Sequence, residues 1–346
     1  MLQSLSGNNP EHTSYRFPID EVSQVGEARR FALVLCSDLD FEETRKGRVA
    51  IIVNELGNNL VRYAKKSQLI FRKFSNRSDI GIEILSIDAG PGMDDSLTLQ
   101  DGYTTGTTLG AGLGAVKRQS DLFDIYSTIG KGTVILSRVY AKKPNELSAD
   151  ETLPYNFEIG AINNPLQGEL ISGDGWCVHE TDHGISVTIV DGLGHGPMAN
   201  QAAIKALHVF AENYRAPVAE VMQKVHTDLR ATRGAAVFLL ATDKNLMSYT
   251  AVGNISAVLH TRLKAKVLSS QNGTAGLRIG TIKSLEEEWQ INEYLVFHSD
   301  GLSGRWNLQD YPGHSERHPS IIAALLFRDF DRGTDDTTVV VVRRLK

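Results

Sequence analysis

Four apolar segments in the second half of the chain each have an aspartate at one end, and this pattern restricts how that half can fold. The aspartates are Asp174, Asp191, Asp300 and Asp335. Hard divalent cations such as Mg²⁺ and Mn²⁺ take oxygen ligands, and a pair of such ions requires several shared carboxylates to offset its charge. The pattern therefore predicts a two-metal centre, and no rival set of Cys and His residues exists for a zinc site.

The segment from Thr188 to Met198 is the clearest part of this pattern. An apolar run ends at Asp191, three glycines follow within five positions, and a helical pattern opens at Pro197, a favourable first helical residue. The glycine beside the aspartate, Gly192, leaves its carbonyl open to the same ion. Taken alone, such a loop is more typical of a polar turn. The other three aspartates favour the metal site.

The first half of the chain carries a different set of polar residues. A helical pattern runs from Asp20, its expected N-cap, to about Leu35, and a second runs from about residue 41 to 64. Glu55 and Asn59 interrupt the second pattern and project from one face, since they are four residues apart. If these two residues were the only signal, a solvated helix surface would be the simpler interpretation.

Two glycine-rich segments weaken that simpler interpretation. A strand-like run over residues 80–87 leads into Asp88 and a Gly-Pro-Gly turn, where the carboxylate can accept a hydrogen bond from an adenine amino group. Residues 110–114 hold three glycines before a helical pattern at 115–122, so backbone N–H groups and the helix N-terminus predict a phosphate cradle. A mobile surface loop is the alternative. The glycines fit neither a Rossmann fingerprint nor a Walker motif.

The order and spacing of these elements resemble the GHKL ATPase fold over roughly residues 15 to 140, in particular the small RsbT-like serine kinases of the anti-sigma and switch-protein group. The resemblance implies that Glu55 is the general base, that Asn59 holds Mg²⁺ on the ATP phosphates, and that Asp88 binds adenine. His12 is the only histidine before Glu55, whereas a sensor histidine kinase would need a phospho-acceptor histidine in a preceding helix pair. The phosphate acceptor is therefore expected to be a serine or threonine of a partner. The nucleotide-binding positions that the resemblance implies are Asn59, Asp88, Gly90, Gly92, Gly110, Gly112, Gly114 and Thr133.

The second half resembles the metal-dependent PPM-type phosphatases and their SpoIIE-like branch, which includes compact RsbX-like members. The resemblance is carried by five ordered stretches: 172–175, 190–196, 253–254, 299–302 and 335–338. It implies that Asp191 bridges two Mn²⁺ or Mg²⁺ ions, that Asp174 and the Gly192 carbonyl complete one sphere, and that Asp300 and Asp335 hold the other ion. Hydroxide then attacks phosphorus in line, without a phospho-enzyme.

Two further residues of this half keep alternative roles. His195 is either an acid for the leaving serine or a residue that shapes its glycine-rich loop. Asp336 is either an auxiliary ligand or a support for the other ligands. Gly175-Trp176 departs from larger relatives, which often carry aromatics and a further acid there.

The patterns predict an α+β chain of two domains. These are a GHKL (Bergerat-type) α/β sandwich at 15–141 and a PPM-type β-sandwich flanked by helices at 156–346, with a flexible N-terminus at 1–14 and a polar linker at 142–155. In the second domain strands are predicted at 157–162, 169–171, 184–190, 235–241, 247–252, 257–261, 293–298 and 337–343, and helices at 198–214 and 218–229.

Bulk properties limit the possible partners. A net charge of -5 and the absence of a sustained basic run exclude a broad nucleic-acid surface. No stretch approaches the ~20 apolar residues that span a bilayer, and the first dozen residues lack an apolar signal core. Cys36 and Cys177 are expected to be reduced thiols. We therefore expect a cytoplasmic protein with no nucleic-acid or membrane partner.

Together these features predict a bifunctional switch enzyme that phosphorylates and dephosphorylates serine or threonine on a STAS-domain antagonist in a partner-switching pathway. A sigma factor or an anti-sigma factor is a further possible partner. Two alternatives stay open: a phosphatase regulated by a non-catalytic ATP-binding domain, and an anti-sigma binding module fused to a phosphatase. Glu55 favours the bifunctional enzyme over the phosphatase with a non-catalytic ATP-binding domain, because a domain that only senses ATP needs no general base.

Overall fold

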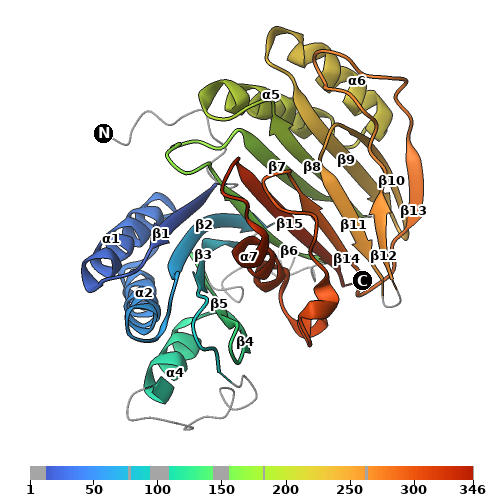
Figure 1. Cartoon of the computed structure of the whole chain (residues 1–346). Helices are drawn as coiled ribbons and strands as arrows, with labels where there is room; N and C mark the ends of the chain where they lie inside the picture. Colours follow the sequence, from blue (N-terminus) through green and yellow to red (C-terminus); the bar gives the residue numbers. More distant parts are fainter. Residues whose placement is uncertain are drawn as a thin grey trace. The chain divides into compact units, whose positions relative to one another are not determined.

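The computed structural model describes residues 13–76, 79–93, 109–142, 156–181, 184–261 and 264–345. They form two compact units (Figure 1). The N-terminal unit contains the described residues between 13 and 154 together with 313–328, and the C-terminal unit contains those between 155 and 312 together with 329–345. Nearly all of the expected flexible N-terminus, 1–14, and of the expected linker, 142–155, lies outside the described residues.

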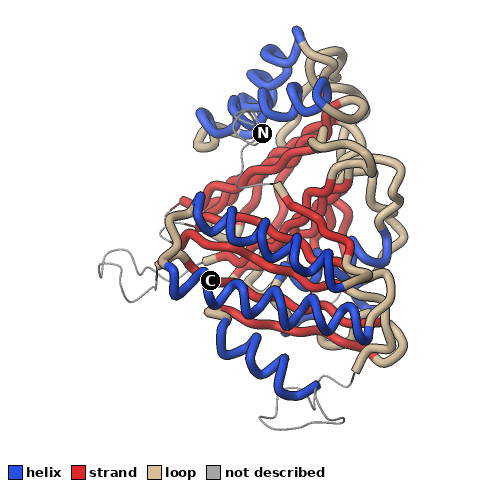
Figure 2. Tube along the Cα trace, turned by 90° about the vertical axis from the view of Figure 1, so that its left-hand side faces the viewer, coloured by secondary structure: helices blue, strands red, loops and turns tan. Residues whose placement is uncertain are grey.

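An antiparallel sheet with strand order β1-β2-β3-β5-β4 forms the centre of the N-terminal unit. Its strands are β1 (Ser14–Pro18), β2 (Gln68–Asn76), β3 (Asp79–Ile87), β4 (Leu122–Thr128) and β5 (Gly132–Tyr140). The helices that pack against it through one apolar core are α1 (Val22–Asp38), α2 (Glu43–Tyr63) and α4 (Leu109–Gln119). Figure 2 shows helices lying along the strands. This is the expected α/β sandwich.

The helices α1 and α2 form where the sequence predicts them, because their apolar residues recur at helical spacing and face the sheet. They pack closely at Gly57, where a Cβ would lie only 2.5 Å from Val25 Cγ1. The start of α1 differs from the prediction. Its N-cap is Glu21, whose backbone N–H donates to Gln24 Oε1 at 2.9 Å, rather than Asp20.

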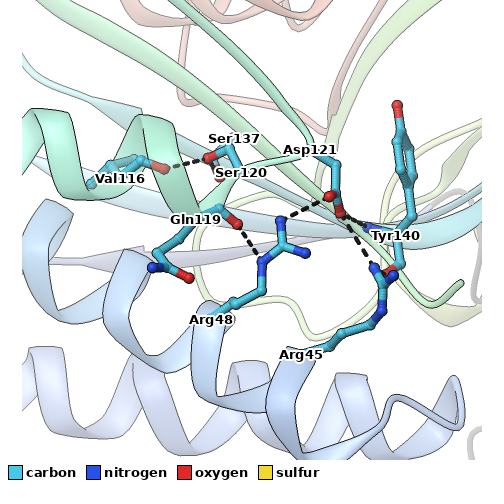
Figure 3. A network of polar contacts seen from close by, with 8 residues as sticks. All are labelled: Arg45, Arg48, Val116, Gln119, Ser120, Asp121, Ser137 and Tyr140. Carbon is cyan, nitrogen blue, oxygen red and sulfur yellow. Dashed lines mark hydrogen bonds and ion pairs between the residues drawn. The ribbon is translucent and has the colours of Figure 1, made fainter. Parts of the chain in front are cut away.

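A polar network ties the end of α4 to α2 (Figure 3). Arg48 donates to the Gln119 carbonyl and to the Asp121 carboxylate, both at 2.8 Å. Arg45 donates to the Tyr140 carbonyl at 2.8 Å, and the Tyr140 N–H donates to Asp121 at 2.9 Å. These bonds fix α4 beside α2, and both helices carry predicted nucleotide-binding residues.

The opposite face of this sheet receives the segment 313–328. Strand alternation turns Glu83 away from Ile82 and Ile84, which belong to the core on the helix side. The helix α7 (Pro319–Phe330) begins here, and Ser320 donates to Glu83 at 2.8 Å. The sequence patterns did not predict α7. Its residues from Pro319 to Phe327 are all buried, so it has no amphipathic period to detect.

The C-terminal unit is a sandwich of two antiparallel sheets with strand orders β13-β10-β9-β8-β7 and β12-β11-β14-β15-β6. The strands are β6 (Phe157–Asn164), β7 (Asp174–Thr181), β8 (Gly184–Gly192), β9 (Ala235–Asp243), β10 (Leu246–Val252), β11 (Ser256–His260), β12 (Ala265–Leu268), β13 (Leu285–Glu288), β14 (Tyr294–His298) and β15 (Thr337–Arg344). Apolar residues of both sheets, such as Phe238 and Phe297, form one core between them. The predicted α+β class and sandwich are confirmed.

The helices α5 (Pro197–Asn213) and α6 (Val218–Asp228) pack through a second apolar core on the first of these sheets. The predicted helix start at Pro197 is confirmed. The strand predicted at 169–171 is wrong: the segment is a loop in which Leu170 is 93% exposed. The backbone that follows is bound by a side chain and by the end of β8: Asn200 donates to the Ser172 carbonyl at 2.7 Å, and the Gly192 N–H donates to the Gly173 carbonyl at 3.1 Å. No helix in the described part of the chain is long and apolar enough to cross a membrane.

Candidate functional sites

Asp174 and Asp191 face each other across a strand pair. β7 begins at Asp174, and the antiparallel register places it opposite Asp191 near the end of β8. Side chains in such a pair have Cβ atoms roughly 4.5–5.5 Å apart, and like charges there are destabilising. Asp174 is only 4% exposed. The pair therefore requires a proton or a cation to offset the repulsion.

Asp300 and Asp335 approach the same place from the second sheet. They follow β14 and precede β15, which pair with each other. Burial raises the pKa of Asp191 to about 7, helped by the negative charges of Asp300 and Asp335. Burial and the charge of Asp191 also raise the pKa of Asp174, and burial and the charge of Asp335 raise that of Asp300. The structure thus brings the four predicted aspartates together.

The oxygen atoms of this cluster suit a hard divalent cation. Asp174 Oδ2 is buried without a hydrogen-bond partner, which is costly unless a cation contacts it. Within the described residues, however, no three His, Cys, Asp or Glu side chains are arranged so that they could hold an ion as they stand. Asp300 Oδ2 instead accepts a hydrogen bond from Asn254 at 2.6 Å. The carboxylates interact electrostatically, although in the described residues they are not arranged as one ligand set.

Asp336 supports the cluster by holding its backbone. It is 2% exposed, and its two carboxylate oxygens accept hydrogen bonds from the N–H groups of Leu166 and Gly173, both at 2.7 Å. A Cβ on Gly173 would lie 2.8 Å from the Asp336 carboxylate and 2.6 Å from Ala199 Cβ, so the close approach requires glycine. Asp336 therefore positions the residue before Asp174.

His195 lies on the surface of its loop. Its Nδ1 is 2.8 Å from Glu169 Oε1, and its side chain is 54% exposed. Gly194 and Gly196 on either side have φ angles of 87° and 71°, which favour glycine. The contact with Glu169 joins two loops and favours the loop-shaping role over the acid.

The predicted general base lies beside the second glycine-rich segment. Glu55 and Asn59 are half-buried on α2. A Cβ on Gly112 would lie 2.8 Å from Glu55 Oε2 and 3.8 Å from Asn59 Nδ2, so α4 passes close to both. One expectation is wrong: Gly110, Gly112 and Gly114 lie inside α4, which begins at Leu109, and do not precede the helix. The free N–H groups belong to the first turn of α4.

Asp88 follows β3 in a turn where close packing requires two glycines, Gly92 in the turn itself and Gly132 at the start of β5. Its Oδ1 accepts a hydrogen bond from the Gly90 N–H at 2.7 Å, and its own N–H donates to the Thr133 carbonyl at 3.0 Å. Gly132 has a φ of 88°, and a Cβ there would lie 2.1 Å from the Asp88 carbonyl oxygen. Gly92, with a φ of 64°, makes an equally close approach to the Thr128 carbonyl. The predicted adenine-binding residues therefore share one turn.

The contacts of two site residues have no signal in local sequence patterns. Arg328 Nη1 donates to the Asp88 carbonyl at 3.3 Å from 240 positions further along the chain. Asp336 was found only as one member of an acidic pair, and its bonds to the 165–173 loop depend on pairing of β15 with β6. Both contacts arise from long-range topology.

Comparison with known proteins relates the chain to an ATPase domain family, a kinase and a phosphatase. Residues 19–138 match the family model of the histidine kinase-like ATPase domain. The serine/threonine-protein kinase RsbT of Bacillus subtilis (strain 168) is 35% identical over 109 residues, which are 31% of this chain and 82% of RsbT. The phosphoserine phosphatase RsbX of the same organism is 26% identical over 161 residues, which are 45% of this chain and 77% of RsbX.

A solved structure gives a further similarity. It comes from work on the bacterial stressosome, described as a modular system adapted to control secondary messenger signaling. Its chain has 25% sequence identity and a TM-score of 0.52, and the match covers 55% of this chain and 100% of that one. The chain therefore belongs to the family of RsbT; it carries a histidine kinase-like ATPase domain at residues 19–138, and it is also similar to the phosphatase RsbX.

Proposed function

We propose that this chain is a switch enzyme that adds phosphate to serine or threonine of a partner protein and also removes it. Its similarity to RsbT and RsbX supports a serine/threonine phosphatase and a kinase-like ATPase in a regulator of the partner-switching type. The observation that carries the proposal is the buried Asp174–Asp191 pair, which two further aspartates approach from the second sheet.

In the phosphatase site the aspartates hold and orient cations. Two Mn²⁺ or Mg²⁺ ions, when bound, supply an activated water and neutralise the phosphoryl oxygens. The residues that would hold them, as the resemblance implies, are Asp191 for both ions, Asp174 with the Gly192 carbonyl for one, and Asp300 with Asp335 for the other. Because burial and neighbouring charges raise the pKa of Asp191, a cation there displaces a proton.

In the kinase site the chemistry is one of positioning and proton removal. Glu55 would take the proton of the acceptor hydroxyl, and Asn59, one turn further on α2, would hold Mg²⁺ on the ATP phosphates. The first turn of α4 offers backbone N–H groups to the phosphates, and Gly112 brings this helix against both side chains. Asp88 accepts a hydrogen bond from the adenine amino group.

The two relatives support a protein partner that carries phosphate on serine or threonine. RsbT is named as a serine/threonine-protein kinase and RsbX as a phosphoserine phosphatase, so opposing activities in one chain suit a single phosphorylated partner. We propose a STAS-domain antagonist, with a sigma factor or anti-sigma factor as a further partner. A phosphate adds about -1.5 to -2 charge at neutral pH, which is sufficient to create or disrupt a docking surface.

The test is incubation of the full chain with labelled ATP and candidate STAS-domain proteins. Asp191→Ala should accumulate label on the partner, because removal of phosphate is blocked, whereas Glu55→Ala should produce none. Glu43→Ala, an exposed position on the same helix as Glu55, should behave like the wild type. Equal labelling by Asp191→Ala and Glu55→Ala would contradict the assigned roles.

A further inference from the structure

A buried charge cluster attaches the segment 313–328 to the sheet of the N-terminal unit. Glu83 on β3 is 1% exposed and accepts hydrogen bonds from Arg72 at 3.0 Å and from Arg138 at 2.7 Å. Ser320, in the first turn of α7, donates to the same carboxylate at 2.8 Å. Burial acts to raise the pKa of Glu83, but Arg72 and Arg138 lower it to about 2. The cluster therefore stays ionised and binds α7 through a hydroxyl.

A second attachment lies on β4. The Asp124 carboxylate accepts a hydrogen bond from the His318 N–H at 2.7 Å and is 3.5 Å from Arg317 Nη1. His318 Nδ1 accepts in turn from the Ser320 N–H at 3.0 Å. This bond satisfies one of the free donors at the start of α7. The beginning of the helix is thus held at two points, on β3 and on β4.

The same segment reaches the predicted adenine-binding residue at its other end. Arg328 Nη1 donates to the Asp88 carbonyl oxygen at 3.3 Å, and Gly132 approaches that oxygen from the backbone of β5. Burial raises the pKa of the Asp88 carboxyl, whereas hydrogen bonds from Gly90 and Thr133 and the charge of Arg328 oppose the rise. Arg328 therefore restrains the Asp88 backbone and favours the ionised carboxylate, which is an acceptor only.

We propose that Arg328 is a positioning residue for nucleotide binding, because it holds Asp88 where the carboxylate accepts a hydrogen bond from adenine. This inference rests on the proposed ATP site at Asp88. It adds a residue from beyond the matched ATPase domain, which ends at residue 138. The helix that supplies Arg328 lies between β14 and β15 in the chain, so the nucleotide site takes a component from the phosphatase half of the sequence.

The test is equilibrium titration of the full chain with Mg-ATP by calorimetry. Arg328→Ala removes one hydrogen bond and a nearby positive charge, so we expect the affinity to fall about fivefold to tenfold. Arg328→Lys restores a charge and a donor, and should recover most of the affinity. Arg305→Ala removes an exposed arginine from the same stretch of sequence and should bind as the wild type does. Wild-type affinity in Arg328→Ala would overturn the inference.

Two further results separate the possible failures. If Asp88→Ala binds Mg-ATP like the wild type, the proposed ATP site itself is wrong. If Asp88→Ala loses binding while Arg328→Ala keeps it, only the role of Arg328 is wrong. A purely structural role would weaken binding equally in Arg328→Ala and Arg328→Lys and would lower the melting temperature of the nucleotide-free protein. That outcome would also overturn the inference.

Discussion

Replacing Asp191 by asparagine should abolish phosphatase activity and, at the same time, stabilise the metal-free C-terminal unit. The substitution preserves the size of the side chain and removes a charge that burial and neighbouring carboxylates disfavour. Because the pKa of Asp191 is raised, the folded protein keeps a proton that the unfolded chain has lost. Stability therefore falls as the pH rises from about 4, near the ordinary pKa of aspartate, towards 7. Asparagine cannot ionise and escapes this loss.

The magnitude follows from the size of the shift. The pKa of Asp191 rises from 3.8 to about 7, and each pKa unit corresponds to about 1.36 kcal/mol. The upper limit is therefore about 4 kcal/mol above pH 7, and solvent screening of this half-buried group reduces it to about 2–4 kcal/mol. Asp174, whose pKa is also raised, contributes in the same direction in the wild-type chain.

Urea unfolding in EDTA, followed by tryptophan fluorescence, reports on the stability of the C-terminal unit. All three tryptophans, Trp176, Trp289 and Trp306, lie in the C-terminal unit. The wild type should be less stable at about pH 8 than at about pH 5.5, whereas Asp191→Asn should be more stable than the wild type at about pH 8. Asp243→Asn, at the exposed end of β9, serves as the matched control.

The effect of Mn²⁺ on the stability of the C-terminal unit is a complementary measurement. Saturating Mn²⁺ should stabilise the wild-type unit by binding only its folded form and should have little effect on Asp191→Asn. Equal stability of the wild type at the two pH values in EDTA, with no gain from the substitution, would refute the reasoning. It would mean that the carboxylates do not repel one another in the folded protein.

Two other substitutions test the supports of the sites. Asp336→Asn places an amide donor against one of two backbone N–H groups, so we expect a loss of about 1–3 kcal/mol in stability and a higher Mn²⁺ requirement in phosphatase assays. Unchanged Mn²⁺ dependence would contradict its positioning role. Glu83→Gln leaves Arg72 and Arg138 without their buried counter-charge, and should destabilise the N-terminal unit by about 3–5 kcal/mol in denaturation followed by circular dichroism. If Glu83→Gln lowered the stability no more than the exposed control Glu43→Gln, the proposed role of Glu83 as a buried counter-charge would be contradicted.

Elements whose signal is local could be predicted from the sequence. The period of apolar residues in α2 located Glu55 and Asn59 on one helix, and the apolar run before Asp191 located the end of β8. Pro197 marked the start of α5 because proline suits the first helical turn. The strands β14 and β15 were predicted with Asp300 and Asp335 at their ends.

Features that depend on distant partners could not be predicted in the same way. The apolar residue pattern of 169–171 suggested a strand, but the segment is a loop, and Asn200 and Asp336 bond to the backbone of Ser172 and Gly173 directly after it. The short strands β1, β12 and β13 were missed, since they pair at sheet edges and carry little periodicity. The glycines of α4 suggested a loop because glycine disfavours helix, yet they lie in a helix, and Gly112 allows that helix to pass close to Glu55 and Asn59.

The charge cluster beneath α7 is better explained by specificity than by stability. Buried ion pairs add little net stability compared with apolar residues of similar size. The stretch from Ile321 to Phe327 is apolar and buried on every side, so apolar contact alone sets neither its rotation nor its register. The directional bond from Ser320 to Glu83 sets both. Arg328 lies about 12 Å further along the helix, and a slip of one residue would move it by ~1.5 Å and turn it by about 100°. Such a slip would break the bond to the Asp88 carbonyl, so the charged sheet face controls where Arg328 lies.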